Sequence, residues 1–153
     1  MLADKLGYNS ISVNLKVGKI MSQTGIHSEF EKHEILPTPQ RLEVAAILLE
    51  KPQHLSADQI IERLRIAGSA VSKATVYNTL NLFSERGLVK EVMVDPIRKF
   101  YDSTTGPHHH FYNVDSGELS DIPDSMVNFE SLPDLPEGTR RESVEVLIKV
   151  RDQ

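Results

Sequence analysis

The sequence predicts an α+β protein, in which an N-terminal winged helix-turn-helix domain is followed by a small α/β domain. Three capped amphipathic segments precede two short strand patterns, and a histidine-rich strand pattern opens the last third of the chain. Charge divides in the same way: residues 1–101 carry 13 basic and 11 acidic side chains, whereas residues 102–153 carry 4 and 11. This asymmetry predicts different tasks for the two parts.

The composition, 39% apolar and 25% charged, is typical of a soluble globular protein. No apolar run is long enough to cross a bilayer, and no signal-peptide pattern stands at the start. We therefore expect a cytoplasmic protein without a membrane partner. The chain contains no cysteine, which excludes disulfides, thiolate catalysis and a cysteine-ligated structural zinc.

The first segment, residues 1–28, is expected to be an N-terminal extension outside the winged-helix domain of residues 29–102. It is polar and shows no clear amphipathic helix. A short alternating pattern over residues 11–17 is typical of a strand, but nothing nearby offers it a partner.

Capping signals delimit three helices. Thr38 precedes a proline at the first helical position, and this helix ends before Pro52. A capping box at residues 56–59 opens the second helix. Ser72 caps a third helix that Gly87 is placed to end.

Two strand patterns, Leu88–Val94 and Arg98–Asp102, follow the helices and flank an Asp-Pro turn. Three helices and a hairpin are the order of a winged helix-turn-helix, whose third helix lies in the major groove of DNA. Alternatively, the polar face of the third helix is an ordinary exposed surface that does not contact DNA. The residues that we expect to contact DNA are Arg41, Lys73, Thr75, Tyr77 and Asn78.

The triple histidine begins a strand after a hinge-like linker at residues 103–107. His108 and His110 point to one side of such a strand, whereas His109 faces the other. A turn signal after the strand allows Asp121 to return beside the histidines, and Asp102 lies six residues upstream. Two imidazoles and carboxylates suit zinc, manganese or ferrous iron. Alternatively, the three histidines bind no metal and are a solvated run or a tag.

The remainder of the second domain, residues 108–153, offers few core residues. Met126, Phe129 and their neighbours predict one short helix, and the alternation from Val144 to Val150 predicts a terminal strand with one buried face. So small a domain buries little apolar surface alone. We therefore expect it to be a dimerisation domain and the protein to be a homodimer.

Five segments together resemble the ferric uptake regulator (Fur) family of metal-dependent repressors. They are Thr38–Arg41, His54–Asp58, Ala74–Leu80, Gly87–Val89 and His108–Tyr112. The resemblance implies a DNA-binding domain, a hinge and a dimerisation domain, acting on a palindromic double-stranded DNA operator. Many relatives hold a structural zinc with two Cys-x-x-Cys pairs, the first of which falls here on Asn113 and Ser116, so that zinc cannot form.

The resemblance also implies a regulatory metal site that joins the two domains. Carried onto this sequence, its ligands are His54, Asp102, His108, His110 and Asp121. On the sequence alone, His54 is an ordinary surface histidine. The ion is expected to be Fe(II) or Mn(II), with Zn(II) as a further candidate.

The triple histidine and the absence of cysteine resemble most the iron response regulator (Irr) branch, which implies haem sensing through His108, His109 and His110. The expected function is control of iron homeostasis in response to iron or haem. Two alternatives stay open: a peroxide sensor, in which Fe(II) oxidises a histidine ligand, and, from another class, a non-haem iron enzyme. Against an enzyme, five protein ligands leave little room for a substrate.

Overall fold

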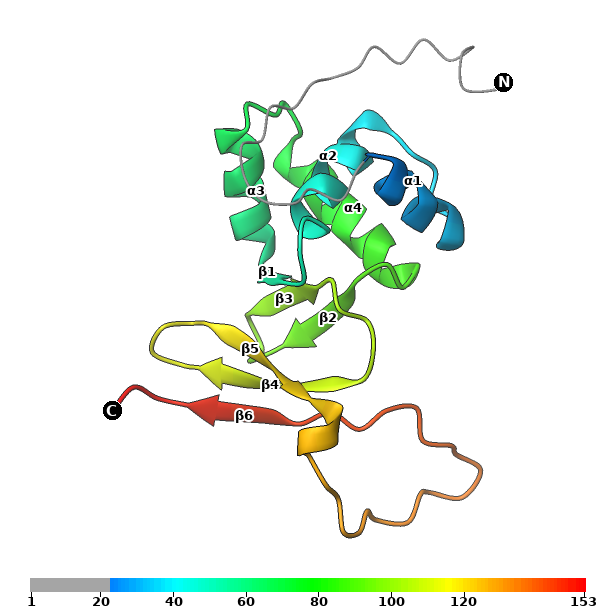
Figure 1. The fold of residues 1–153 in the computed structure, drawn as a ribbon, viewed down its shortest axis with the longest axis vertical. Coiled ribbons are helices and arrows are strands. Elements are labelled where there is room, and N and C mark those ends of the chain that lie inside the picture. Colours follow the sequence, from blue (N-terminus) through cyan, green and yellow to red (C-terminus); the bar gives the residue numbers. More distant parts are fainter. Residues whose placement is uncertain (1–22) are drawn as a thin grey trace.

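The computed structural model describes residues 23–153, so the strand pattern predicted at residues 11–17 lies outside the described part. Helices gather at one end of the molecule and a second sheet lies at the other, with a first sheet between them (Figure 1). Mixed helices and small sheets confirm the predicted fold class. Within this part of the chain, no helix is long and apolar enough to cross a membrane.

Among residues 23–153, four α-helices form the first domain, and the three predicted from capping signals are confirmed. Their bounds are α1 Gln23–Lys32, α2 Pro39–Leu48, α3 Ala57–Ile66 and α4 Lys73–Glu85. Thr38, Ser56 and Ser72 each accept a hydrogen bond from a backbone N–H of the first turn. Gly87 adopts φ +72° just beyond α4, a conformation that glycine adopts without strain.

Helix α1 begins at Gln23, within the segment of residues 1–28 in which we expected no clear helix. Ile26 and Phe30, four residues apart, are buried on one face, and the Phe30 ring lies 5.4 Å from that of Phe83 in α4. Two apolar residues in a polar stretch give too weak a periodic signal to reveal this packing.

The first sheet joins the predicted hairpin to a strand that we did not expect. Its strands are β1 His54–Leu55, β2 Lys90–Met93 and β3 Lys99–Asp102, in the antiparallel order β1-β3-β2. A two-residue strand such as β1 has no recognisable alternation, and only its pairing with β3 defines it.

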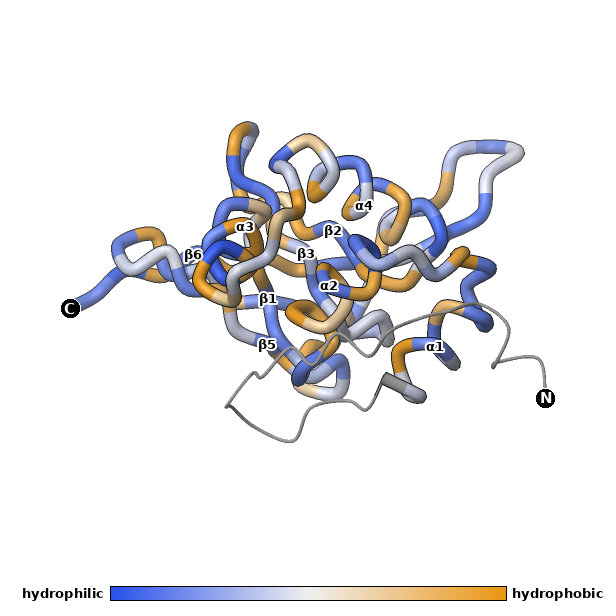
Figure 2. The backbone as a smooth tube through the Cα atoms, turned by 90° about the horizontal axis from the view of Figure 1, so that it is seen from above, coloured by the Kyte–Doolittle hydropathy of each residue, from blue (hydrophilic) through white to orange (hydrophobic). Residues whose placement is uncertain are grey.

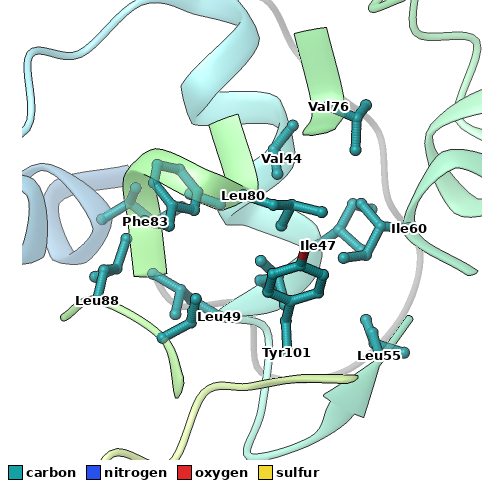
Figure 3. Packing of buried hydrophobic residues seen from close by; sticks show 14 of the residues in the cluster. Val44, Ile47, Leu49, Leu55, Ile60, Val76, Leu80, Phe83, Leu88 and Tyr101 are labelled. Atoms are coloured by element: carbon teal, nitrogen blue, oxygen red, sulfur yellow. The ribbon is translucent and has the colours of Figure 1, made fainter. Parts of the chain in front are cut away.

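The main core lies between the helices and this sheet. Along the helices, apolar and polar stretches alternate (Figure 2), as one-sided burial requires. Figure 3 shows Leu80 of α4 directed toward Ile60 of α3, and Tyr101 rising from β3 toward Ile47. Val76 and Phe83 are also buried, so the predicted inner face of α4 is confirmed.

The second sheet contains the histidine strand at its centre. Its strands are β4 His108–Asn113, β5 Leu119–Pro123 and β6 Leu147–Val150, in the order β5-β4-β6. Strand β5 returns antiparallel to β4, as predicted, and β6 pairs with β4 in parallel.

Two expectations for the second domain are wrong in detail. Instead of a helix near Phe129, a single 3₁₀ turn, η2 Asp124–Met126, is followed by a long loop that projects from the sheet (Figure 1). The last strand starts at Leu147 rather than Val144, and Ile148 and Val150 are exposed rather than buried. Prolines interrupt the loop, which favours extended backbone over helix.

Candidate metal centre

Five side chains from the two sheets converge at the junction of the domains. They are His54, Asp102, His108, His110 and Asp121, and each offers one nitrogen or oxygen so that all these atoms lie within 4.8 Å of one another. This set is the one that the family resemblance implied. His54 and Asp102 come from the first sheet, and the other three come from the second.

Strand register explains why residues so distant in sequence meet. His54 on β1 lies directly opposite Asp102 on β3, and His110 on β4 lies directly opposite Asp121 on β5. His108 precedes His110 by two residues, so alternation along β4 directs both imidazoles to the same side. The centre is therefore two cross-strand pairs, one from each domain, with a third histidine beside them.

The carboxylate of Asp102 lies at the middle of the cluster and is fully buried. Its Oδ2 atom is 2.7 Å from Nε2 of His108, 3.1 Å from Nε2 of His110 and 3.3 Å from Nε2 of His54. Asp121 Oδ1 closes the other side, 2.8 Å from Nε2 of His54. All three histidines thus direct the same nitrogen toward two carboxylates.

The hydrogen-bond geometry of His108 favours a cation between these groups. Its Nδ1 atom lies 2.7 Å from the carbonyl oxygen of Gly106 and must donate a proton to it. A neutral ring then directs the lone pair of Nε2 at a carboxylate oxygen of Asp102, which also carries only lone pairs. Either a proton on this ring or a metal ion resolves that conflict, and a fixed Nδ1–H is the usual orientation of a metal-binding histidine.

His54 supplies a second indication. Its Nε2 atom is buried and has no partner in hydrogen-bond geometry among the described residues, although Asp121 Oδ1 is close. A nitrogen buried in this way is costly unless it has a hydrogen-bond partner or binds a metal. Three imidazole nitrogens and two carboxylates match Fe(II), Mn(II) or Zn(II).

The charges in the centre shift two pKa values in opposite directions. Burial alone would lower the pKa of His54, but its attraction to the nearby carboxylates of Asp102 and Asp121 outweighs burial and raises this pKa. Burial alone would raise the pKa of Asp102, but the hydrogen bond with His110, the close approach of His54 and the hydrogen bond from the Thr104 N–H hold it far below its usual range. Asp102 is therefore a permanent anion in the folded protein.

His109 lies on the opposite side of β4, as the strand alternation predicted. Its Nδ1 atom accepts a hydrogen bond of 3.0 Å from the backbone N–H of Val146, and Nε2 lies 3.2 Å from Asp124 Oδ1. The His109 ring also packs 6.1 Å from that of Phe129. His109 is thus a buried residue that joins β4 to the chain just before β6, outside the metal cluster.

The outer face of α4 carries most of the residues expected to contact DNA. Its exposed polar side chains include Lys73, Tyr77, Asn78 and Asn81. Thr75 is half-buried, and its hydroxyl lies 2.8 Å from that of Ser72 at the helix N-terminus. Arg41 lies on α2 and donates a hydrogen bond of 2.8 Å to the carbonyl oxygen of Leu36.

Of the five clustered residues, His54 could not be found from local sequence. It lies two residues before the N-cap Ser56. The capping box there shows only that His54 precedes the start of α3, and it does not mark His54 as a ligand. The pairing of β1 with β3 is what brings His54 to Asp102, which is 48 residues further along the chain.

Solved structures with this fold include ferric uptake regulators. The ferric uptake regulator of Pseudomonas aeruginosa, solved with manganese, has a TM-score of 0.65 and 26% identity, covering 83% of this chain and 97% of that chain. The ferric uptake regulator of Vibrio cholerae has a TM-score of 0.64 and 20% identity, over 83% and 99% of the two chains.

Curated relatives are similar over a shorter stretch. The peroxide operon regulator of Bacillus subtilis is 36% identical over 85 residues, which cover 56% of this chain and 59% of the relative. The peroxide-responsive repressor PerR of Staphylococcus aureus is 31% identical over 91 residues, or 60% and 62% of the two chains. Residues 32–143 match the sequence pattern of the Ferric uptake regulator family. The match covers most of the chain, and the protein belongs to the Ferric uptake regulator family.

Proposed function

We propose that this protein is a homodimeric transcription regulator whose binding to a palindromic DNA operator is controlled by a divalent metal ion. The observation that carries the proposal is the five-residue cluster drawn from both domains. Family membership supports the regulatory role, and the exposed polar face of α4 supplies a surface for the major groove.

A metal ion held by this cluster would couple the orientation of the two domains to metal availability. His54 and Asp102 move with the winged-helix domain, whereas His108, His110 and Asp121 move with the second sheet. An ion shifts a conformational equilibrium by its differential affinity for the two arrangements. About 1.4 kcal/mol of such difference changes an equilibrium tenfold, so a single site is sufficient. In a dimer, this orientation sets the spacing of the two α4 helices.

Two adjacent histidines provide a matched test. His108→Ala removes a cluster ligand and is expected to abolish Mn(II)-dependent DNA binding. His109→Ala alters the other face of β4 and is expected to retain it. Operator binding is measured by fluorescence anisotropy for each variant, with Mn(II) and with a chelator. A result in which His109→Ala loses the metal response and His108→Ala keeps it would refute the assignment.

The signal that the protein senses has three candidates, namely peroxide, iron and haem, and the named relatives favour peroxide. The Bacillus and Staphylococcus proteins are a peroxide operon regulator and a peroxide-responsive repressor. The cluster here consists of nitrogen and oxygen donors, which suit Fe(II). In this hypothesis, Fe(II) held by the cluster would activate hydrogen peroxide, so that one oxygen atom is inserted into a ligand histidine while the other leaves as water, and the loss of a ligand would release DNA.

Peptide mass spectrometry distinguishes peroxide sensing from simple iron sensing. After treatment of the Fe(II) protein with hydrogen peroxide, a peroxide sensor gains one oxygen atom in the peptide that contains His54 or in the one that contains the triple histidine. The Mn(II) protein serves as the control, because it should not be oxidised. An unmodified Fe(II) protein that still releases DNA on iron removal would favour iron sensing.

Haem sensing, expected from the resemblance to the Irr branch, remains a prediction that the comparisons leave without support. His108, His109 and His110 are only 7%, 1% and 3% exposed. Haem would therefore have to open the centre before its iron could bind a histidine, and it would then compete with the metal. A haem titration followed by absorbance, with and without Mn(II), tests this: competition by Mn(II) is the expected result.

A further inference from the structure

A second apolar cluster lies between the two domains, separate from the helical core. The hairpin contributes Val92, Val94 and Phe100, and the second sheet contributes Tyr112 and Leu119. All five are at most 8% exposed. We call this set the wing–sheet cluster. Among the described residues, it is the only core cluster to which the second sheet contributes buried side chains.

The opposite face of the second sheet is covered at His109 but open around Phe111. Phe111 of β4 and Ile148 of β6 lie side by side in register, and they are 39% and 40% exposed. Tyr112, the next residue along β4, is 1% exposed because the hairpin covers its face of the sheet. Separation of the domains would expose the wing–sheet cluster to water, a cost that rises with the apolar area uncovered.

Polar contacts reinforce the same junction. Lys90 at the start of β2 forms an ion pair of 2.6 Å with Glu145, which lies just before β6. The guanidinium carbon of Arg98 lies 5.8 Å from the centre of the Tyr112 ring, within the range of a cation–π contact. Neither contact involves one of the five residues of the metal centre.

The wing–sheet cluster and the metal centre lie next to each other on one face of β4. His108, His110 and Tyr112 alternate along that strand, and on the other side of the junction Asp102 follows Phe100 by two residues. A rotation of one domain against the other that opens the metal centre would therefore also open the wing–sheet cluster.

We propose that the wing–sheet cluster, with the Lys90–Glu145 ion pair, keeps the two domains docked in the absence of metal, and that its strength sets the metal affinity of the adjacent centre. The metal ion then tightens an arrangement that already exists instead of assembling it. That the domains are docked without metal does not depend on the proposed function. That docking sets the metal affinity rests on the metal centre proposed above.

Docking is measured directly as a distance between spin labels in the full chain. Because the protein has no cysteine, the double variant Glu62→Cys/Glu118→Cys takes one label on α3 and one beside β5. Dilution with unlabelled chain removes distances between subunits. In chelator-treated protein, the proposal predicts one narrow distance distribution that Mn(II) leaves unchanged. A broad distribution without metal that narrows only when Mn(II) is added would overturn it.

Substitutions then test whether the cluster is responsible. Phe100→Ala is expected to broaden the metal-free distribution and to weaken Mn(II) binding several-fold in isothermal titration. Met93→Ala is the matched control, because Met93 lies on the same hairpin and is 52% exposed. Equal effects of the two variants, or none from Phe100→Ala, would contradict the proposal.

A charge exchange provides a test that does not disturb the core. Lys90→Glu alone is expected to broaden the metal-free distribution, and the double variant Lys90→Glu/Glu145→Lys is expected to restore it. Failure of the double variant to restore the distance would remove the ion pair from the proposal. If Mn(II) failed to bind even the parent protein while the distance stayed narrow, the proposed function would fail and the docking would stand.

Discussion

At the scale of single residues, Asp102 links the two domains more directly than any other side chain of the centre. Its Oδ1 atom accepts a hydrogen bond of 2.8 Å from the N–H of Thr104, at the start of the hinge. Its Oδ2 atom faces all three histidines, one of them from its own domain and two from the other. A buried carboxylate is stable only with such partners, so its charge fixes the approach of the imidazoles.

The raised pKa of His54 predicts opposite pH dependences for the metal-free and metal-bound protein. Without metal, its contribution to the free energy of unfolding is complete below its ordinary pKa of about 6.5 and is lost as the pH rises through the raised value. Metal binding shows the reverse, because a protonated imidazole cannot coordinate. Thermal unfolding of chelated protein should therefore show a stability loss above about pH 6.5 that His54→Ala lacks, whereas Mn(II) affinity should increase. A His54→Ala profile identical to that of the parent would contradict this.

At the scale of elements, the sequence predicted what local chemistry dictates. Capping side chains located α2, α3 and α4, and the two-residue period of a strand separated His109 from His108 and His110. The sequence prediction missed features that depend on contacts between residues far apart in the chain. Helix α1 depends on a contact with Phe83, and β1 consists of two residues that are ordered only by β3.

The same reason explains how much of the metal centre could be predicted. Asp102, His108, His110 and Asp121 are reached by counting along strands and one turn. His54 requires the fold, or the resemblance to a family, because no local pattern separates it from any exposed histidine.

Helix α4 carries the prediction for DNA binding. Tyr77 is 40% exposed on α4, whereas its neighbours Val76 and Leu80 are buried. Tyr77→Ala is expected to lower specific operator affinity by roughly 1–3 kcal/mol, the usual value of a base contact. Measured affinity should also fall steeply with salt, because phosphate contacts release counterions. Unchanged operator affinity in Tyr77→Ala would exclude α4 as the recognition helix.

At the scale of the whole molecule, polar contacts occupy the place where many relatives carry cysteines. Asn113 accepts hydrogen bonds from the N–H groups of Asp115 and Ser116, and it donates one of 2.7 Å to Asp152. Arg151 forms an ion pair of 3.0 Å with Asp115. The end of the chain is thereby tied to the turn between β4 and β5 without thiolate ligands.

Assembly should accordingly be independent of metal. The apolar face of Phe111, Ile148 and Val150 is exposed in one chain and is expected to be buried in a homodimer. Sedimentation in the presence of a strong chelator should show an intact dimer, since no cysteine-bound zinc exists to be removed. Monomers formed on chelation would show that a metal ion, and not apolar burial, holds the subunits together.

The central claim is that one metal ion is held by both domains, and His54 tests it best because it lies outside the domain of the triple histidine. The measurement is a Co(II) titration of the parent, His54→Ala and His27→Ala, followed by visible absorbance. His27 is an exposed histidine of α1 and serves as the control. The account predicts that His54→Ala weakens Co(II) binding and changes the spectrum, while His27→Ala does neither. Identical titrations for all three proteins would contradict it.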